Sequence, residues 1–173
     1  EGSQLIKVAE SISNKYSLKN INYNEIIEKK ESYYKEKNSF SLYDGVIEFV
    51  SLLKEKGIKI AIVSAARKDR LFSTVPRDFL EKFDTIVTGD VILNGKPYPD
   101  SYLKAMSELN LKPEECIVIE NAPLGIEAAK IAGTYCIAIS STMGEEYLSK
   151  ADEIVEKFSD LTRLNKIKTL LEA

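Results

Sequence analysis

Residues 116–133 read CIVIENAPLGIEAAKIAG, a strand-like run followed by a helix-like one, and the expected fold is organised around them. The first four residues form an apolar run, β-branched at three of the four positions, which is typical of a buried parallel strand. Pro123 is tolerated in the first turn of a helix, and the small residues after it predict a helix that ends at Gly133. Glu120 and Asn121 therefore lie at the carboxyl end of a parallel strand, the end at which open α/β sheets bind ligands.

The side chains of Glu120 and Asn121 both carry hard oxygen atoms, the ligands that Mg²⁺ prefers in proteins. The two residues thus form a candidate magnesium site. A second interpretation stays open, because asparagine is also a favourable N-cap residue. In that case both residues would only cap the helix that follows them.

The composition is that of a globular protein. Of the 173 residues, 44% are hydrophobic and 29% are charged, which suits one domain, or one domain with a small appendage. The net charge of −3 and the pI of about 5.3 argue against nucleic acid or an anionic membrane surface as a partner. No apolar run has the length of a membrane span and no signal peptide is visible, so we expect a cytoplasmic protein.

Cysteine and histidine usage narrows the chemistry further. Cys116 and Cys136 each begin an apolar, strand-like run, which favours buried free thiols in a reducing compartment over a disulfide or a metal-binding pair. The chain contains no histidine, which excludes Ser-His-Asp hydrolysis, Cys-His proteolysis and most catalytic zinc sites. Any general acid–base catalysis would therefore have to use carboxylates, lysine or tyrosine.

The spacing of apolar residues predicts an all-helical beginning and an alternating remainder. Two helices are expected near the start, at 5–16 and 22–37. Further along, strands alternate with helices, a pattern typical of a parallel sheet with helices on both faces. The expected strands are 58–63, 85–88, 116–119, 135–139 and 153–155. The expected helices of this part are 46–56, 77–82, 100–109, 123–132, 145–150 and 161–171.

The loop after the strand at 58–63 begins with Ser64, Ala65 and Ala66. The serine hydroxyl and the backbone N–H groups of both alanines could bind a phosphoryl oxygen at the start of the next helix. The alternative interpretation is a serine that only caps this helix. The sequence therefore marks these three residues as a candidate phosphate-binding loop.

A second polar group lies in a restrained loop. Lys96 stands between Gly95 and Pro97 in the segment GKPYPD, where it is more restrained than an ordinary surface lysine. As a compact cation it could offset the charge of a phosphate and of nearby carboxylates, although a plain loop lysine would fit the same pattern. Ser64, Lys96 and Glu120 all follow strands of one predicted sheet, so we expect them to converge at its carboxyl edge.

Together these motifs resemble the haloacid dehalogenase (HAD) superfamily, close to its β-phosphoglucomutase-like phosphatase branch. The family's serine or threonine at the end of an apolar strand is matched by Ser64 in IAIVSAA, and its GKPxPD lysine is matched by Lys96. The family's acidic pair before a G-I-x-A-A-x-x-A-G helix is matched by Glu120 and Asn121 in IENAPLGIEAAKIAG. The resemblance covers nearly the whole chain, and the last two motifs form a specific combination.

The resemblance implies a Rossmann-like, three-layer α/β core with a parallel sheet and a small helical cap. Residues 43–46, YDGV, resemble the point at which the family's chain re-enters its core. Residues 1–42 would then be the later part of the cap, and residues 43–173 would be the core without its first strand. The implied activity is Mg²⁺-dependent hydrolysis of a small phosphorylated metabolite through an aspartyl-phosphate.

The resemblance also implies a role for each candidate residue. Ser64 and the two N–H groups after it would hold the phosphoryl group. Lys96 would orient the nucleophile and neutralise charge. Glu120 and Asn121 would bind Mg²⁺ directly or through water, and the cap would close over the site and select the substrate.

The chain departs from the family pattern in two places. Asn121 stands where aspartate is commoner, which removes one negative charge from the metal site. The D-x-D motif of the first strand, whose aspartates are the nucleophile and the general acid–base in the family, occurs nowhere in the chain. That strand would lie between the strands that end at Ser64 and Glu120. We therefore expect the nucleophile to lie upstream, in a longer protein.

Two other functions remain open at this point. A phosphosugar mutase would use the same residues, and would differ only in the cap and in the acceptor that reaches the aspartyl-phosphate. A catalytically inactive binding module of the same fold would fit the missing D-x-D motif and Asn121. The sequence indicates neither the identity of the metabolite nor an oligomeric state.

Overall fold

The computed structural model describes residues 5–37 and 40–172, and it begins with two helices, α1 (Leu5–Lys15) and α2 (Tyr23–Glu36). The other α-helices are α3 (Val46–Glu55), α4 (Lys68–Thr74), α5 (Arg77–Leu80), α6 (Asp100–Leu109), α7 (Pro123–Ile131) and α8 (Asn165–Glu172). The strands are β1 (Ala61–Val63), β2 (Thr85–Val87), β3 (Ile117–Glu120), β4 (Tyr135–Ile139) and β5 (Glu153–Val155). Short 3₁₀ helices are η1 (Gly89–Val91), η2 (Pro113–Glu115), η3 (Glu145–Tyr147) and η4 (Phe158–Arg163).

The strands of the described chain form two parallel sheets rather than one. In the first sheet β1 pairs with β2, in register from Ala61 opposite Thr85 to Val63 opposite Val87. In the second sheet β4 is central and pairs with β3 on one side and β5 on the other. Every ladder is parallel, as the alternating pattern predicts, but β1 and β3 are not paired with each other.

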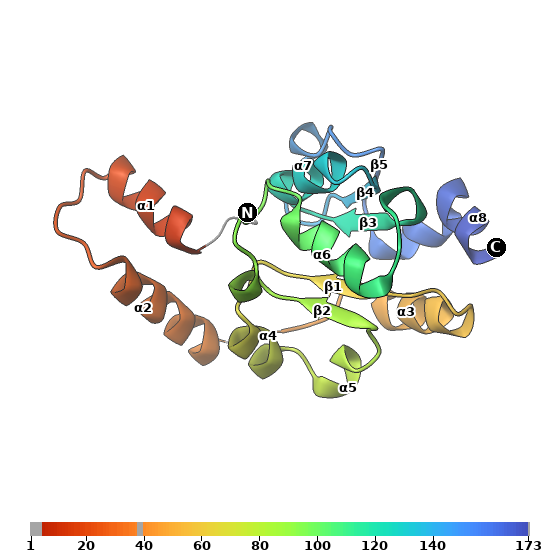
Figure 1. The fold of residues 1–173 in the computed structure, drawn as a ribbon, viewed down its shortest axis with the longest axis horizontal. Coiled ribbons are helices and arrows are strands. Elements are labelled where there is room, and N and C mark those ends of the chain that lie inside the picture. The colour runs from red at the N-terminus through yellow and green to blue at the C-terminus, as the bar shows by residue number, and fades with distance from the viewer. Residues whose placement is uncertain (1–4, 38–39, 173) are drawn as a thin grey trace.

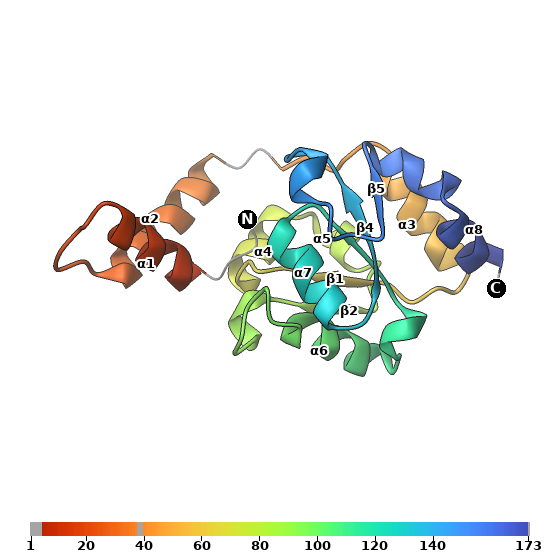
Figure 2. The same cartoon turned by 90° about the horizontal axis from the view of Figure 1, so that it is seen from above.

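The central strand β4 is buried on both faces. Its Ile137 and Ile139 pack with α3 and α8, whereas its Cys136 and Ala138 pack with α6 and α7. Figure 2 shows α3 and α8 on one side of the sheet and α6 and α7 on the other. This double burial explains why the strand is a continuous apolar run rather than an alternating one.

The helices α1 and α2 stand apart from the sheets (Figure 1) and are called the helical segment, residues 5–36, below. Asn22 caps α2, because its Oδ1 accepts N–H groups of the first helical turn. The helical segment contacts the core where α2 meets α4. At that contact Arg70 Nη1 donates to Glu31 Oε1 at 3.3 Å.

The strand expected at 58–63 is shorter in the structure, since β1 begins only at Ala61. The backbone N–H of Ile60 donates to Asp84 Oδ2 at 2.8 Å, so a side chain occupies the position of a strand partner. The other oxygen of Asp84 accepts a hydrogen bond from Lys54 Nζ at 2.9 Å. This aspartate therefore joins α3, the start of β1 and the start of β2.

Two helices near the end of the chain differ from those that the sequence predicts. The one expected at 145–150 is a single 3₁₀ turn, η3. The one expected at 161–171 is divided into η4 and α8, because Leu164 between them has an extended backbone. Within residues 5–37 and 40–172, no helix is both long and apolar enough to cross a membrane.

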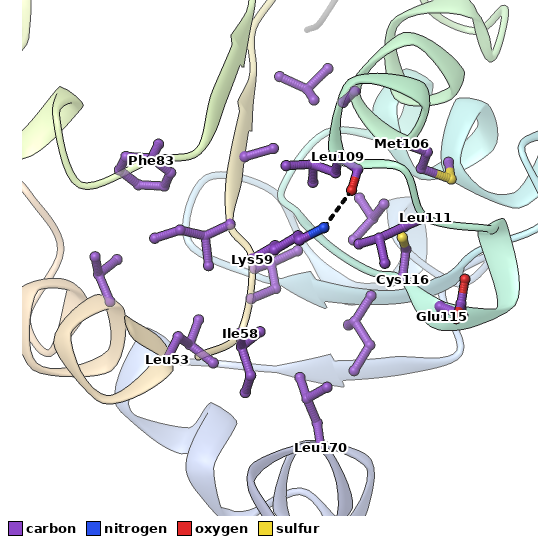
Figure 3. A pocket seen from close by; sticks show the side chains of 18 of the residues that line it. Leu53, Ile58, Lys59, Phe83, Met106, Leu109, Leu111, Glu115, Cys116 and Leu170 are labelled. Atoms are coloured by element: carbon purple, nitrogen blue, oxygen red, sulfur yellow. Dashed lines mark hydrogen bonds between the residues drawn. The ribbon is translucent and has the colours of Figure 1, made fainter. Parts of the chain in front are cut away.

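A cavity of about 610 Å³ separates the two sheets, and we call it the inter-sheet cavity. Its walls come mainly from β1, β3, α3, α6 and α8, and most of the lining side chains are apolar (Figure 3). Lys59 lies beside it and its Nζ donates to Leu109 O of α6 at 2.8 Å. Val63 and Glu120 also line the cavity, so it reaches the carboxyl ends of both flanking strands.

We predict that one further parallel strand fits between β1 and β3, and that the 173-residue chain alone is insoluble, molten or associated. Each backbone group left unpaired at a buried sheet edge costs about 1–3 kcal/mol. Several such groups would exceed the roughly 5–15 kcal/mol by which an ordinary domain is stable. A thermal melt should therefore show a cooperative transition only when an extended apolar segment is supplied, in cis or as a peptide.

The two cysteines report on whether the cavity is filled. Cys116 lines the cavity, and burial, with the nearby Glu115 and Glu114, raises the pKa of its thiol. Cys136 is fully buried in β4 and serves as an internal control. A bound strand should slow thiol labelling of Cys116 and leave Cys136 unreactive. A cooperative, monomeric melt of the chain alone, with Cys116 already protected, would contradict the prediction.

Candidate functional site

Ser64 begins the loop directly after β1. Its backbone N–H donates to Val87 O at 2.9 Å, which extends the β1–β2 ladder by one residue. Its Oγ accepts the N–H of Ala66 at 3.1 Å, so the hydroxyl is held by its own loop while its proton stays available to an anion. The N-cap residue of α4 is Arg67, so the interpretation of Ser64 as a simple cap of that helix is wrong.

Gly89, for which the sequence pattern predicts no role, fixes this loop against the second strand. Its N–H donates to Ala66 O at 2.8 Å. A Cβ atom at position 89 would overlap the carbonyl group of Ala65, so only glycine allows the two backbones to approach this closely. In the sequence, this role is indicated by the position of Gly89, which directly follows an apolar strand and Thr88.

Lys96 and Glu120 form a buried ion pair at the carboxyl end of β3. Lys96 Nζ donates to Glu120 Oε1, and the two side chains are only 7% and 10% exposed. The loop that carries Lys96 is closed by a hydrogen bond of 2.9 Å from Asn94 Nδ2 to Asp100 Oδ1. The structure thus brings the lysine of the GKPYPD motif into contact with the glutamate of the next motif.

The second oxygen of Glu120 caps the loop that leads into α7. Glu120 Oε2 accepts the N–H groups of Asn121 at 2.8 Å and of Ala122 at 2.9 Å. Ala122 is the N-cap residue of α7, so the interpretation of Asn121 as the helix cap is wrong, and Glu120 instead holds the two residues that precede the helix. Burial alone would raise the pKa of the Glu120 carboxyl, but Lys96 and the two N–H groups outweigh burial and hold that pKa below its usual value.

Tyr102 of α6 is the third side chain of this cluster. Its hydroxyl donates to Glu120 Oε1 at 3.0 Å, and Lys96 Nζ lies 4.9 Å from the centroid of its ring. The helical pattern of 100–109 predicts Tyr102 only as one residue of an apolar face. The sequence signal is a tyrosine on a helix face that is otherwise mostly apolar, because a buried tyrosine hydroxyl usually needs a hydrogen-bond partner.

Gly125 provides the space for the Glu120 carboxylate. A Cβ atom at position 125 would overlap both carboxylate oxygens of Glu120, so this carboxylate packs directly against the first turn of α7. The first glycine of the G-I-x-A-A-x-x-A-G pattern therefore has a steric role in the site.

Asn121 is half-buried, and its Nδ2 donates to Thr142 Oγ1 at 3.4 Å. Among the residues that the structure describes, no group of three or more His, Cys, Asp or Glu side chains could hold a metal ion. Mg²⁺ needs fewer protein ligands, because it keeps several waters and binds substrate oxygens. The oxygen donors of Glu120 and Asn121 fit Mg²⁺ in their chemistry. Each Glu120 oxygen already accepts two protein hydrogen bonds, so this carboxylate would have to give up one of them to contact the ion, directly or through water.

A polar cavity of about 580 Å³ lies where α2 meets the start of α4. Most of its lining side chains are charged, and they include Glu28, Glu31 and Arg67. Beside it, the guanidinium of Arg70 bonds to Glu31 and lies 4.8 Å from the centroid of the Tyr34 ring. This cavity therefore lies between the helical segment and the part of the core that follows the Ser64 loop.

Residues 2–139 match the profile of the family described as haloacid dehalogenase-like hydrolase. The chain is 33% identical over 119 residues to validoxylamine A 7′-phosphate phosphatase of Streptomyces hygroscopicus subsp. limoneus, a match that covers 68% of this chain and 56% of that protein. It is 41% identical over 90 residues to the phosphorylated carbohydrates phosphatase of Thermotoga maritima, which covers 51% of this chain and 42% of that protein. The chain thus spans about half the length of these relatives.

Solved structures show the same fold. β-Phosphoglucomutase of Clostridium difficile superposes with a TM-score of 0.80 at 26% identity, over 99% of this chain and 78% of that chain. CbbY of Rhodobacter sphaeroides, in complex with xylulose-1,5-bisphosphate, superposes with a TM-score of 0.72 at 26% identity, over 82% of this chain and 67% of that chain. These similarities confirm the predicted fold class and the predicted resemblance to the β-phosphoglucomutase-like branch.

We predict that Gly125→Ala destabilises the protein, although the same change in an ordinary helix stabilises it by about 1 kcal/mol. The added methyl group displaces the Glu120 carboxylate and so leaves buried polar groups unpaired, at a cost of about 1–3 kcal/mol. Urea unfolding of the two proteins at pH 7, both with the strand of the inter-sheet cavity supplied, measures the difference.

The control is the same substitution in a Glu120→Ala background. There the space next to position 125 is empty, so Gly125→Ala should be neutral or stabilising, and the double-mutant cycle should show a large coupling between the two positions. If Gly125→Ala stabilises the protein equally in both backgrounds, the carboxylate does not depend on this glycine.

Proposed function

Because the chain belongs to the haloacid dehalogenase-like hydrolase family, we propose that it carries the phosphate-binding part of a phosphatase for a small phosphate monoester. The observation that supports this most strongly is the buried Lys96–Glu120 pair, beside a cavity that also reaches the end of β1. A lysine held in this way offers a fixed positive charge to a phosphate dianion, and to the charge that develops as the phosphoryl group transfers.

In this proposal the nucleophile is an aspartate on a strand that occupies the inter-sheet cavity, upstream of the present sequence. A parallel strand between β1 and β3 ends at the same edge as Ser64 and Glu120. The aspartate attacks phosphorus in line, the P–O bond to the substrate breaks, and a second aspartate, in its protonated carboxylic acid form, gives its proton to the leaving oxygen and becomes a carboxylate. Water then attacks the aspartyl-phosphate and releases inorganic phosphate.

The residues of this chain act on the phosphoryl group from two sides. The Ser64 hydroxyl and the N–H of Ala65 donate hydrogen bonds to its oxygens, on a loop that Gly89 holds in place. The N–H of Ala66, which donates to Ser64 Oγ, would join them only by giving up that bond. Lys96 lies between the nucleophile and the phosphoryl oxygens and offsets the negative charge of both. Glu120 keeps Lys96 in that place through the buried ion pair.

The proposed cofactor is Mg²⁺, which when bound would polarise phosphoryl oxygens and neutralise part of their charge. Asn121 would hold it through its side-chain oxygen, and Glu120 directly or through water. Since Asn121 carries no charge, the ion would depend on Glu120, on the substrate phosphate and on the carboxylates of the added strand for its negative ligands.

The helical segment serves in this proposal as the cap that selects the substrate. The polar cavity beside Arg67 and Glu31 offers charged donors and acceptors to a substrate rich in hydroxyl groups. Two relatives are named as phosphatases of validoxylamine A 7′-phosphate and of phosphorylated carbohydrates, which agrees with such a substrate. We therefore propose a phosphorylated, polyhydroxylated small metabolite.

A phosphosugar mutase is the second candidate, favoured by the TM-score of 0.80 with a β-phosphoglucomutase. The two reactions differ in whether water or a substrate hydroxyl receives the phosphoryl group. Conversion of a sugar 1-phosphate into its isomer, faster than free phosphate appears, would decide for the mutase.

We predict that Lys96→Ala lowers the hydrolysis of a generic aryl phosphate by at least about 100-fold, as the loss of a single transition-state donor does. The assay uses the protein with its nucleophile strand present and follows phosphate release. Removal of divalent metal with a chelator should abolish the same activity, and added Mg²⁺ should restore it.

The matched control is Lys130→Ala, because Lys130 also forms a short ion pair, with Asp152 at 2.6 Å, but in the last turn of α7, whereas Glu120 packs against its first turn. Its turnover should stay close to that of the unaltered protein. Turnover that survives both Lys96→Ala and chelation would rule out the proposed reaction. The absence of turnover in every form, with phosphate binding retained, would favour the inactive binding module.

We predict that Asn121→Asp tightens Mg²⁺ binding by about fivefold or more. An added negative charge at about 4 Å contributes about 1 kcal/mol in water and more in a partly buried site. Calorimetric titration with Mg²⁺ measures the affinity directly, and the Mg²⁺ dependence of turnover provides a second readout. If neither changes, Asn121 lies outside the metal site.

A further inference from the structure

We propose that Tyr102 is a positioning residue of the active site: its hydroxyl orients the Glu120 carboxylate, and through it the Lys96 ammonium. The role rests on the proposed phosphatase function, because it concerns the lysine that meets the phosphoryl group. The motifs of the sequence do not include this tyrosine, which lies two residues after GKPYPD and points from α6 toward Glu120.

The Glu120 carboxylate accepts four hydrogen bonds, one of them from Tyr102. Oε2 accepts two backbone N–H groups of the loop before α7, and Oε1 accepts Lys96 Nζ and Tyr102 Oη. A carboxylate accepts about four such bonds. Tyr102 therefore supplies the last donor, and without it Oε1 would be held by Lys96 alone.

Both Tyr102 and the Glu120 side chain are buried. Tyr102 is 5% exposed and the side chain of Glu120 10%, so water does not readily replace the tyrosine hydroxyl. An incompletely bonded carboxylate at such a site is unfavourable, and it would rotate toward other donors. Lys96 would follow it, because the lysine is bound to the same oxygen.

The ring and the hydroxyl of Tyr102 have different contacts, so the hydroxyl can be removed while the ring is kept. The ring packs with Met106 and Ile126 in the cluster between α6 and α7, and its face lies 4.9 Å from Lys96 Nζ. A phenylalanine at this position would keep these contacts and would lose only the hydrogen bond to Glu120. The position therefore allows a test in which packing is held constant.

The experiment compares Tyr102→Phe with the matched control Tyr135→Phe. Tyr135 also donates its hydroxyl to a glutamate, Glu153 Oε1 at 2.8 Å, but in the β4–β5 pair away from Lys96. Both variants are prepared in the folded protein, with the cavity strand present where folding needs it. Urea unfolding verifies the fold, and Tyr102→Met provides a second variant that lacks the hydroxyl.

Two readouts are measured. The first is the side-chain ammonium resonance of Lys96 in nitrogen NMR, assigned from its loss in Lys96→Arg. It should shift in both Tyr102 variants and stay in place in Tyr135→Phe. The second readout is turnover. In Tyr102→Phe, kcat should fall about tenfold while KM stays within about twofold. Loss of a residue that hydrogen-bonds a group of the site typically lowers activity by about this factor.

An unchanged Lys96 resonance in Tyr102→Phe and Tyr102→Met would overturn the proposal. So would a loss of kcat no greater than that of Tyr135→Phe. If even the unaltered protein has no turnover, the proposed phosphatase function fails, whereas the Lys96 resonance still decides whether Tyr102 positions the pair.

Discussion

The buried ion pair of Lys96 and Glu120 is the interaction on which the functional part of this structure depends. Two opposite charges this far from water are tolerated only when both are paired and the carboxylate is fully hydrogen-bonded. Glu120 meets that condition with one oxygen toward Lys96 and Tyr102 and the other toward the start of α7. A single carboxylate therefore ties the lysine loop, two helices and the end of β3 together, and Gly125 leaves it the space to do so.

The division of the strands into two sheets is the second constraint. The carboxyl ends of β1 and β3 face the same apolar cavity, and each strand has a neighbour on its other side. The Ser64 loop and the ion pair thus lie at the edge of the inter-sheet cavity, and the reaction proposed for them needs a nucleophile on a strand within it. The helical segment meets the core through Arg70 and Glu31, a polar contact of the kind that allows two parts of a protein to move relative to each other.

Much of this arrangement could be predicted from local patterns. The apolar runs predict β3, β4 and β5 to within a residue, since a buried parallel strand needs a continuous run of such side chains. The runs of β1 and β3 end at Ser64 and Glu120 and so mark both as residues at strand ends. The prediction for β1 failed where a distant side chain intervened, because Asp84 accepts the N–H of Ile60 at a position where the strand was expected to continue. The interpretation of Asn121 as a helix cap failed for a local reason, because Ala122 is the N-cap residue of α7.

Local patterns along the chain were enough to predict the α/β class and the polar residues at the strand ends, and the motifs at those ends carried the resemblance to the family. Which of those residues meet depends on the folded chain. It placed Lys96 on Glu120, added Tyr102 to them, assigned Gly89 and Gly125 their steric roles, and left β1 and β3 apart. The physical reason is that a buried donor bonds to whichever acceptor the fold brings within about 3 Å, and that choice depends on residues far away in the chain.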